Sequence, residues 1–261
     1  MPKVNSRWRG LRCGLSLVTA LLVGTSLASA QDQTVAATNA PLPKAPPWET
    51  IAAAGLTLTR GNSHTLLGTL NLDTKRKWDR NEAALGVAGG YGEDRDVKNT
   101  EFLNAFGQYN RLFTDRLYAG LRGVFNYDGI ADLSYRVTVS PLAGYYLVKA
   151  TNTTFSVEAG PSAVFEKYQD QEESTYLGFR LGERFEHKLS PTTRIWQSAD
   201  YVPQVDKWSE KYIITAEAGI DVAINKHWSL RVVCQTLYDS QPANDRDHYD
   251  IRIIAGTAYK F

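Results

Sequence analysis

The chain has 261 residues, with 29 basic and 28 acidic side chains and a formal net charge of +1. This balance gives no global electrostatic field that would attract nucleic acid, so we expect no nucleic-acid partner. Two cysteines are too few for a disulfide scaffold or a cysteine-ligated zinc site, and we expect no cofactor. A mean hydropathy of −0.33 excludes a bundle of membrane helices but is compatible with a membrane barrel, whose strands are apolar on one side only.

Residues 1–30 have the organisation of a secretory signal peptide. Four basic residues precede an uncharged stretch over 13–30, whose apolar centre spans 15–23. The stretch ends in Ala-Ser-Ala at 28–30, the small-residue pattern of a cleavage site. We therefore predict export and cleavage before Gln31, with a permanent N-terminal anchor helix as the alternative.

Residues 31–47 form a short segment rich in proline and alanine. Four of its last seven residues are prolines, which favour an extended polyproline conformation without a core. We expect a disordered periplasmic lead-in here and a folded domain over 48–261. Without the signal peptide the chain keeps only Cys234, so it needs no disulfide even in an oxidising compartment.

From Trp48 onward, apolar residues recur at every second position, which is the period of a β-strand. The segment that ends at Phe261 is the clearest, because apolar residues on one face oppose Asp250, Arg252 and Lys260 on the other. The same alternation predicts twelve strands, at 49–60, 64–74, 81–92, 99–111, 116–127, 133–148, 153–167, 174–188, 193–203, 210–224, 227–239 and 248–261.

The length and connection of these segments favour an all-β, antiparallel transmembrane barrel. A tilted strand crosses a bilayer with about 9–11 residues, which most of the segments exceed. Short turns alternate with longer polar loops, as in outer-membrane barrels. We expect a monomeric barrel in the bacterial outer membrane with both termini in the periplasm. A secreted soluble sandwich, whose apolar face would pack inward, is the alternative.

Charged residues in the middle of strands lie on the face opposite the apolar one, which becomes the lumen of a barrel. We expect opposite charges there to pair between neighbouring strands. Strands three to six place mostly small residues on this face, so the sequence predicts a charged wall opposite a smooth wall that would carry any water path. The smooth wall comprises Ala84, Gly86, Ala88, Gly90, Gly120, Ser140 and Gly144, with Arg122 and Arg136 as exceptions; the charged wall comprises Glu158, Glu166, Arg180, Arg184, Glu186, Glu217, Asp221, Arg231 and Arg252.

Aromatic residues near the strand ends occupy the other face, where membrane interfaces place their aromatic girdles. Glu183 also falls on that face, where a carboxylate is costly in lipid. Either a bulge shifts the register after Leu181, or Glu183 lies near the periplasmic rim, which we favour. The predicted interface aromatics are Tyr212, Trp228, Tyr238, Tyr249, Tyr259 and Phe261.

The two ends of the predicted barrel differ in charge. The short turns carry ten basic and two acidic residues, whereas the longer loops carry seven basic and fourteen acidic residues. The acidic loops are compatible with divalent cations that bridge lipopolysaccharide, or they are simply solvated. We expect outer-membrane lipid, lipopolysaccharide and the barrel-assembly machinery as partners.

Several short motifs resemble a known family. The run from Gly55 to Thr65 resembles the opening hairpin of the salt-induced, YdiY-like outer-membrane barrels, and its Gly61-Asn62 turn predicts that the first outer loop is the shortest. Similarity continues in 112–118, in 144–147 and in 157–161. The alternating aromatic residues before Phe261 resemble the insertion signal of outer-membrane barrels. The resemblance covers 48–261 and implies fold and location; the family is functionally uncharacterised.

Two short motifs invite a catalytic hypothesis. Asp247 and His248 lie in the acidic run 244–250, which suggests an outer-membrane protease or a Ca²⁺ site. Ser63 and His64 suggest a lipase-like nucleophile pair. Adjacent residues on a strand point to opposite faces, and the spacing of the acidic run is no recognised Ca²⁺ loop, so we expect no enzyme and no metal site. Three classes of function remain open: a small passive channel, a structural or stress-response barrel without transport, and an outer-membrane hydrolase.

Overall fold

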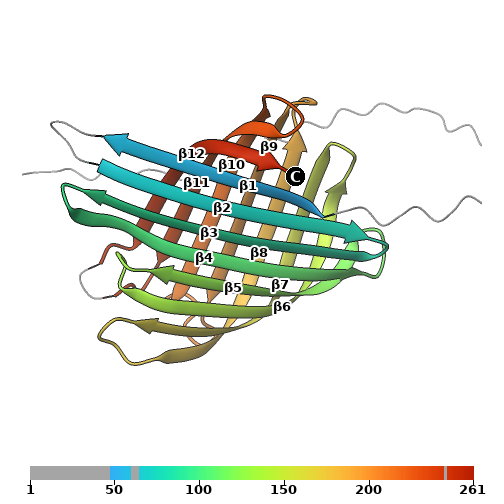
Figure 1. Ribbon diagram of the computed structural model, residues 1–261. Helices are drawn as coiled ribbons and strands as arrows, with labels where there is room; N and C mark the ends of the chain where they lie inside the picture. Colours follow the sequence, from blue (N-terminus) through green and yellow to red (C-terminus); the bar gives the residue numbers. More distant parts are fainter. Residues whose placement is uncertain (1–47, 60–64, 244–245) are drawn as a thin grey trace, which may run out of the picture. The chain divides into compact units, whose positions relative to one another are not determined.

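Residues 48–59, 65–243 and 246–261 are described by a computed structural model, and within them twelve antiparallel strands form one closed barrel (Figure 1). Each strand pairs with its neighbours in the sequence, and β1 pairs with β12 to close the ring. The strands are β1 (Glu49–Thr59), β2 (Thr65–Trp78), β3 (Asn81–Asp94), β4 (Val97–Leu112), β5 (Leu117–Asp128), β6 (Leu133–Lys149), β7 (Thr153–Tyr168), β8 (Ser174–Lys188), β9 (Thr193–Pro203), β10 (Tyr212–Ala223), β11 (Trp228–Asp239) and β12 (Tyr249–Lys260).

The predicted fold class and all twelve strands are confirmed. The largest difference in bounds is at β2, which continues to Trp78 instead of ending at Thr74. Lys75 and Lys77 share the inward face of Asp73, and the outward Arg76 lies over the rings of Trp48 and Trp78, 6.0 and 5.4 Å from their centroids. The predicted signal peptide, lead-in and Gly61-Asn62 turn lie outside the described residues.

The barrel has two distinct ends, which we call the turn end and the loop end. The turn end holds the start of β1, the end of β12 and connections of two to four residues. The loop end holds the longest connections, after β9 and β11. The first outer loop, which the sequence predicts to be the shortest, falls at 60–64, outside the described residues, and Arg95 and Asp96 alone join β3 to β4. Both have positive φ, 51° and 65°, as the tight turns of hairpins require.

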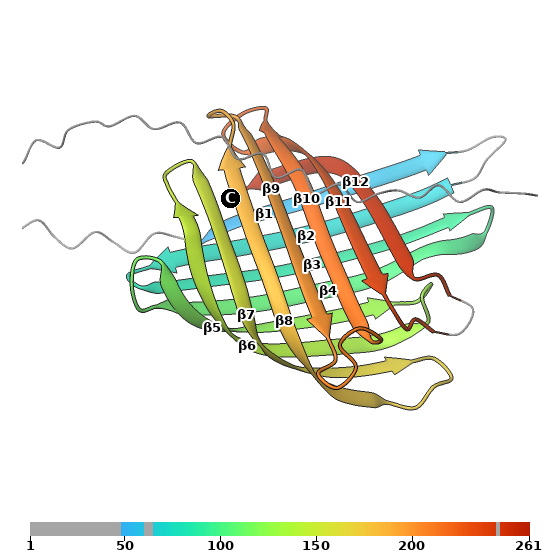
Figure 2. The ribbon, with the colours of Figure 1, turned by 180° about the vertical axis from the view of Figure 1, so that it is seen from behind.

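The seam between β1 and β12 is much shorter than the other strand pairings. Only four register pairs join these strands, from Ile51↔Lys260 to Ala54↔Thr257, whereas β1 and β2 are paired over eleven. Figure 2 shows β1 and β12 together at the turn end and spread apart toward the loop end. At Gly256 the backbones approach so closely that an added Cβ would lie 2.4 Å from the carbonyl oxygen of Ala54. The ring is therefore closed mainly at the turn end.

The outer surface of the barrel is apolar and the inner surface is polar. Leu70, Leu72, Ile251 and Ile253 are 70%, 47%, 65% and 70% exposed on the outside. The inside holds buried charged residues, among them Arg180, and its buried apolar residues form only small groups. No helix among the described residues is long and apolar enough to cross a membrane.

Glu183 lies on the outer surface. The pairing of β8 with both neighbours runs without a register shift past this residue, so the bulge that we considered after Leu181 is absent. Glu183 is paired with Val157 and Ala199, toward the turn end of β8, and its Oε1 accepts a hydrogen bond of 2.5 Å from the side-chain amide of Gln197. This hydrogen bond from a neighbouring side chain partly offsets the cost of removing the carboxylate from water.

Candidate functional site in the barrel lumen

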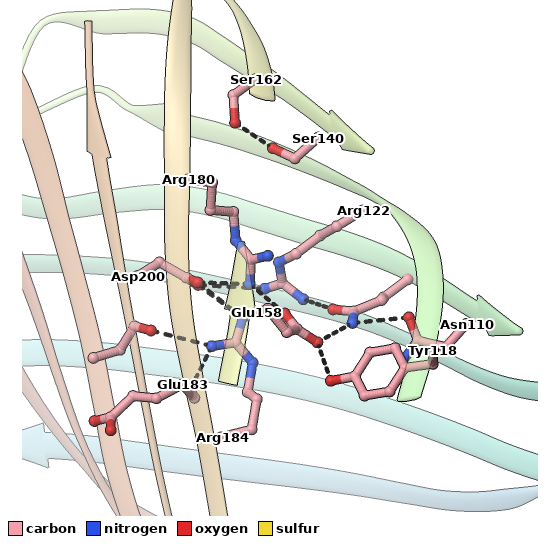
Figure 3. Close-up of polar contacts among 12 residues, drawn as sticks. Asn110, Tyr118, Arg122, Ser140, Glu158, Ser162, Arg180, Glu183, Arg184 and Asp200 are labelled. Atoms are coloured by element: carbon pink, nitrogen blue, oxygen red, sulfur yellow. Dashed lines mark hydrogen bonds and ion pairs between the residues drawn. The ribbon is translucent and has the colours of Figure 1, made fainter. Parts of the chain in front are cut away.

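Five side chains from β5, β7, β8 and β9 meet at mid-height in the lumen, and we call them the central cluster: Arg122, Glu158, Arg180, Arg184 and Asp200. Arg180 Nη2 lies 2.7 Å from both Glu158 Oε2 and Asp200 Oδ1, and Arg184 Nη2 lies 2.8 Å from Asp200 Oδ2. Arg122 reaches Asp200 from across the lumen at 4.0 Å. Figure 3 shows the three guanidinium groups gathered around the two carboxylates.

Neutral side chains complete the hydrogen bonds of Glu158. The amide of Gln108 donates to Glu158 Oε1 at 2.6 Å, and the hydroxyl of Tyr118 donates to the same oxygen at 2.9 Å. Arg122 donates to Gln108 Oε1 at 2.9 Å. The Nε and Nη1 atoms of Arg180 nevertheless have no hydrogen-bond partner in the described part of the chain, although they are buried. Three cations thus share two anions, an excess of one positive charge.

A second group, the loop-side cluster, lies nearer the loop end and consists of Arg136, Glu166, Tyr168 and Asp239. Arg136 donates to Glu166 at 2.8 Å and to Asp239 at 2.5 Å, and the Tyr168 hydroxyl donates to Asp239 at 2.7 Å. The side chains of Arg136, Glu166 and Asp239 are only 4%, 3% and 8% exposed. Four strands separate β6 from β11 by the shorter way round, so this cluster crosses the lumen.

Two further ion pairs connect elements on different sides of the loop end. Arg252 of β12 contacts Asp128 of β5, and four strands separate these two as well. Asp128 also accepts hydrogen bonds of 3.0 Å from the backbone amides of Ile130 and Ala131, which hold the β5–β6 loop. Arg246 lies 2.6 Å from Asp132, so the last loop is tied to the loop after β5.

A third group, the turn-side cluster, consists of Asp73, Glu186, Arg194, Asp221 and Arg231. Arg231 and Arg194 both contact Asp221, at 2.8 and 2.5 Å, and Arg231 also reaches Asp73 at 3.0 Å. Glu186 lies 3.4 Å from Arg194 and 3.6 Å from Lys75 of β2, which is diametrically opposite β8 in the barrel. Most of these side chains are more exposed than those of the loop-side cluster.

The predicted smooth wall is wrong, because aromatic rings from neighbouring strands cover three of its seven small residues. A Cβ added at Gly86, Gly90 or Gly144 would lie 2.2 to 2.4 Å from the rings of Phe106, Phe102 and Tyr118, respectively. Glycine therefore makes room for a ring on the adjacent strand. Cations lie over two of these rings: Arg252, from β12, is 4.4 Å from the centroid of Phe102, and Arg122, from the neighbouring strand β5, is 4.8 Å from that of Phe106.

The predicted arginines each lie within hydrogen-bond distance of an inward carboxylate. Arg180, Arg184 and Arg231 do so on neighbouring strands, as the alternation suggested, whereas Arg252 reaches across the lumen. The remaining carboxylates of the predicted wall also have partners. Glu166 contacts Arg136 and Lys211, Glu186 contacts Lys75 and Arg194, and Glu217 accepts hydrogen bonds from Trp196 and Gln235 instead of from a cation.

Residues 52–261, nearly the whole described barrel, match the model of the family DUF481, whose description is "Protein of unknown function". The chain belongs to this family. A relative from Escherichia coli strain K12, the uncharacterized protein YdiY, is 23% identical over 236 residues, which cover 89% of this chain and 90% of the relative. The resemblance to YdiY-like barrels is thereby confirmed.

Solved barrels resemble this DUF481 chain at low identity. The translocator domain of the autotransporter NalP from Neisseria meningitidis is 15% identical, covering 84% of this chain and 90% of its own, with a TM-score of 0.47. The KdgM porin is 10% identical, covering 82% and 99%, with a TM-score of 0.44.

The aromatic residues predicted at the membrane interfaces form two outward groups on the DUF481 barrel. At the loop end, Tyr238 lies between Tyr212 and Tyr249, with ring centroids 5.5 and 4.7 Å away. At the turn end, Tyr259 lies between Trp228 and Phe261, both 5.0 Å away. The two groups thus lie at opposite ends of β10, β11 and β12.

In the described part of the chain, the residues of the two catalytic motifs do not assemble into a site. His248 contacts the backbone carbonyl of Asp239 through Nδ1, at 2.7 Å, and its ring stacks on Tyr238. Ser63, His64 and Asp245 lie outside the described residues. In the described part of the chain, no group of three histidine, cysteine or acidic side chains could hold a metal ion.

Sequence reasoning missed the acidic partners that complete the lumen clusters: Asp73, Asp128, Asp200 and Asp239. The alternation of β9 already places Asp200 on the inward face with Trp196, so that signal was present. Asp128 and Asp239 end their strands, where the alternation does not distinguish an inward residue from a loop residue.

Proposed function

We propose that this chain is an outer-membrane barrel, with the turn end in the periplasm and the loop end outside the cell. Three features support this location: the exposed apolar outer surface, the two outward groups of aromatic residues, and the polar interior. In lipid, backbone polar groups must be paired within the protein, and a closed barrel meets that requirement.

The location is tested by fractionation and by gel migration with and without boiling. Closed barrels keep their structure in detergent until they are heated, so unheated protein should migrate differently from boiled protein, and both should come from the outer-membrane fraction. Recovery in the soluble periplasmic fraction, with the same migration before and after boiling, would overturn the proposal.

We further propose that the lumen is closed to free diffusion of solutes, so that the barrel is not a general porin. The observation that carries this proposal is the set of ion pairs across the lumen, Arg136–Asp239 and Arg252–Asp128 toward the loop end and Lys75–Glu186 at the turn end. Twelve strands leave an interior that side chains of one wall alone do not fill. Here long arginine side chains span it from opposite walls.

Conductance in a planar bilayer tests the closed lumen. The wild-type barrel should give no steps above the baseline. A quadruple variant, Arg136→Ser, Asp239→Ser, Arg252→Ser and Asp128→Ser, removes both bridges toward the loop end without changing the net charge, and it should open. The double variant Lys98→Ser and Glu101→Ser is the control, because it removes an ion pair of 2.8 Å that does not cross the lumen. Stable porin-like steps from the wild type overturn the proposal whatever the variants do.

A small passive channel is the second candidate, and the polar lining of the lumen favours it. The inward charges of the predicted charged wall are nearly balanced, five acidic and four basic. An opened lumen should therefore discriminate weakly between anions and cations, which reversal potentials of the quadruple variant would report. Strong selectivity for one sign would contradict this candidate.

We propose that the barrel is a monomer without enzymatic activity. The inward carboxylates of the three clusters are engaged by arginine or lysine, which leaves none placed as a free general base. The acidic loops would contact divalent cations and lipopolysaccharide, and assembly would use the barrel-assembly machinery. Release of an amino acid, fatty acid or sugar by purified protein from a matching substrate panel would contradict the absence of activity.

A further inference from the structure

A cavity of about 400 Å³ opens at the turn end of the barrel, beneath the turn-side cluster. Its walls come from β1 and β2, from β8 to β12, and from the connections after β8 and β10. Seven lysine or arginine residues and three acidic residues line it. The lining therefore has a formal charge of +4, in a barrel whose whole chain is close to neutral.

The three acidic residues of this cavity already have basic partners. Glu49 lies 3.9 Å from Lys75, Glu186 contacts Lys75 and Arg194, and Asp221 contacts Arg194 and Arg231. These contacts leave other cations of the lining without a carboxylate. Within the described residues, Lys188, Lys226 and Lys260 have no carboxylate oxygen within 4.0 Å, although all three line the cavity.

The three lysines come from different elements and converge on one space. Lys188 ends β8, Lys226 lies in the connection between β10 and β11, and Lys260 ends β12. Arg194 and Arg231, joined through Asp221, form a layer of ion pairs on the lumen side of this space. A solute that enters from the turn end would meet unpaired ammonium groups before it meets that layer.

We propose that this cavity binds a small, multiply charged anion that bears phosphate groups. Ammonium groups are compact donors that suit phosphate oxygens, and several around one space favour a ligand with more than one charge. Partly enclosed walls of one sign also concentrate counter-ions. The site takes its ligand from the turn end alone, so the inference does not require that the lumen conducts.

Titration calorimetry with inorganic tripolyphosphate tests the site on the folded, full-length barrel in a zwitterionic detergent at low salt. The wild type should bind with a stoichiometry near one. A triple variant, Lys188→Gln, Lys226→Gln and Lys260→Gln, should bind at least about tenfold more weakly. The control neutralises three cations at the same end that do not line the cavity, Arg80→Gln, Arg116→Gln and Lys149→Gln, and should stay within about twofold of the wild type.

Each outcome decides the proposal. Absence of binding to the wild type overturns it, and so does an equal loss in both triple variants, because that result means unspecific attraction to a basic rim. Equal affinity for citrate overturns the preference for phosphate. Preferential binding to vesicles of phosphatidylglycerol over phosphatidylcholine, without binding of tripolyphosphate, would assign the basic residues to lipid headgroups instead. The gel shift on heating confirms that each variant is folded.

Discussion

The two ends of the lumen use the same chemistry in different surroundings. At the loop end, Arg136 is almost completely enclosed with Glu166 and Asp239. At the turn end, Lys75 and Glu186 also connect opposite walls, but their side chains are 40% and 32% exposed, beside a cavity. When one partner of an enclosed pair is removed, the remaining charge stays buried without solvation. When one partner of an exposed pair is removed, water solvates the remaining charge. The loop end should therefore contribute far more to stability than the turn end.

The largest effect is expected from Arg136→Met. This change leaves Asp239 without its cation in a buried setting, and such losses cost about 3–5 kcal/mol. The midpoint of unfolding in urea, followed by the loss of the gel shift, should fall strongly. The double variant Arg136→Met and Asp239→Leu should recover part of the loss, because it removes the buried anion too. A single variant as stable as the wild type would show that water replaces the arginine.

An intermediate effect is expected from Arg231→Met in the turn-side cluster. Arg231 is only 6% exposed, but its partner Asp221 keeps a second cation, Arg194, at 2.5 Å. The change should cost about 1–3 kcal/mol, measured by the same urea unfolding. Combining it with Arg194→Met should cost more than the sum of the two single changes, since Asp221 then loses both cations. Strict additivity would contradict the shared role.

The smallest effect is expected from Lys75→Met, which removes the exposed bridge across the turn end. Exposed ion pairs contribute about 0–1 kcal/mol, so the unfolding midpoint should hardly move. Any small difference should vanish at high salt, because exposed charges are screened. A loss comparable to that of Arg136→Met would remove the contrast between the two ends.

The seam between β1 and β12 adds a difference between the ends that no local pattern indicates. The sequence predicts full-length strands at both 49–60 and 248–261, yet only four pairs join the two strands. How far two strands remain paired depends on tilt and closure of the whole ring, and these are properties of all twelve strands together.

The strand count and the inward or outward face of most residues were predictable from the sequence. Both follow from a period of two, which is local: Arg180 and Glu158 alternate with apolar neighbours, and a strand leaves no other assignment for them. The general expectation that opposite charges pair between neighbouring strands holds for Arg231 and Asp221, because the two residues face each other on adjacent strands. The prediction of a smooth wall was wrong because the space over its glycines, which the sequence shows as empty, is filled by the rings of Phe102 and Phe106.

Only the tertiary structure decided which walls meet across the lumen. Arg136 and Asp239 are 103 residues apart, Asp128 and Arg252 are 124 apart, and Asp73 and Arg231 are 158 apart. Alternation shows that each of these side chains can point inward, but the partner opposite depends on the tilt of the strands and on the relative heights of distant residues. The sequence by itself determined an inward-charged, outward-apolar barrel. Closure of the ring decided that long side chains cross its interior, and that one end is enclosed while the other keeps a basic cavity.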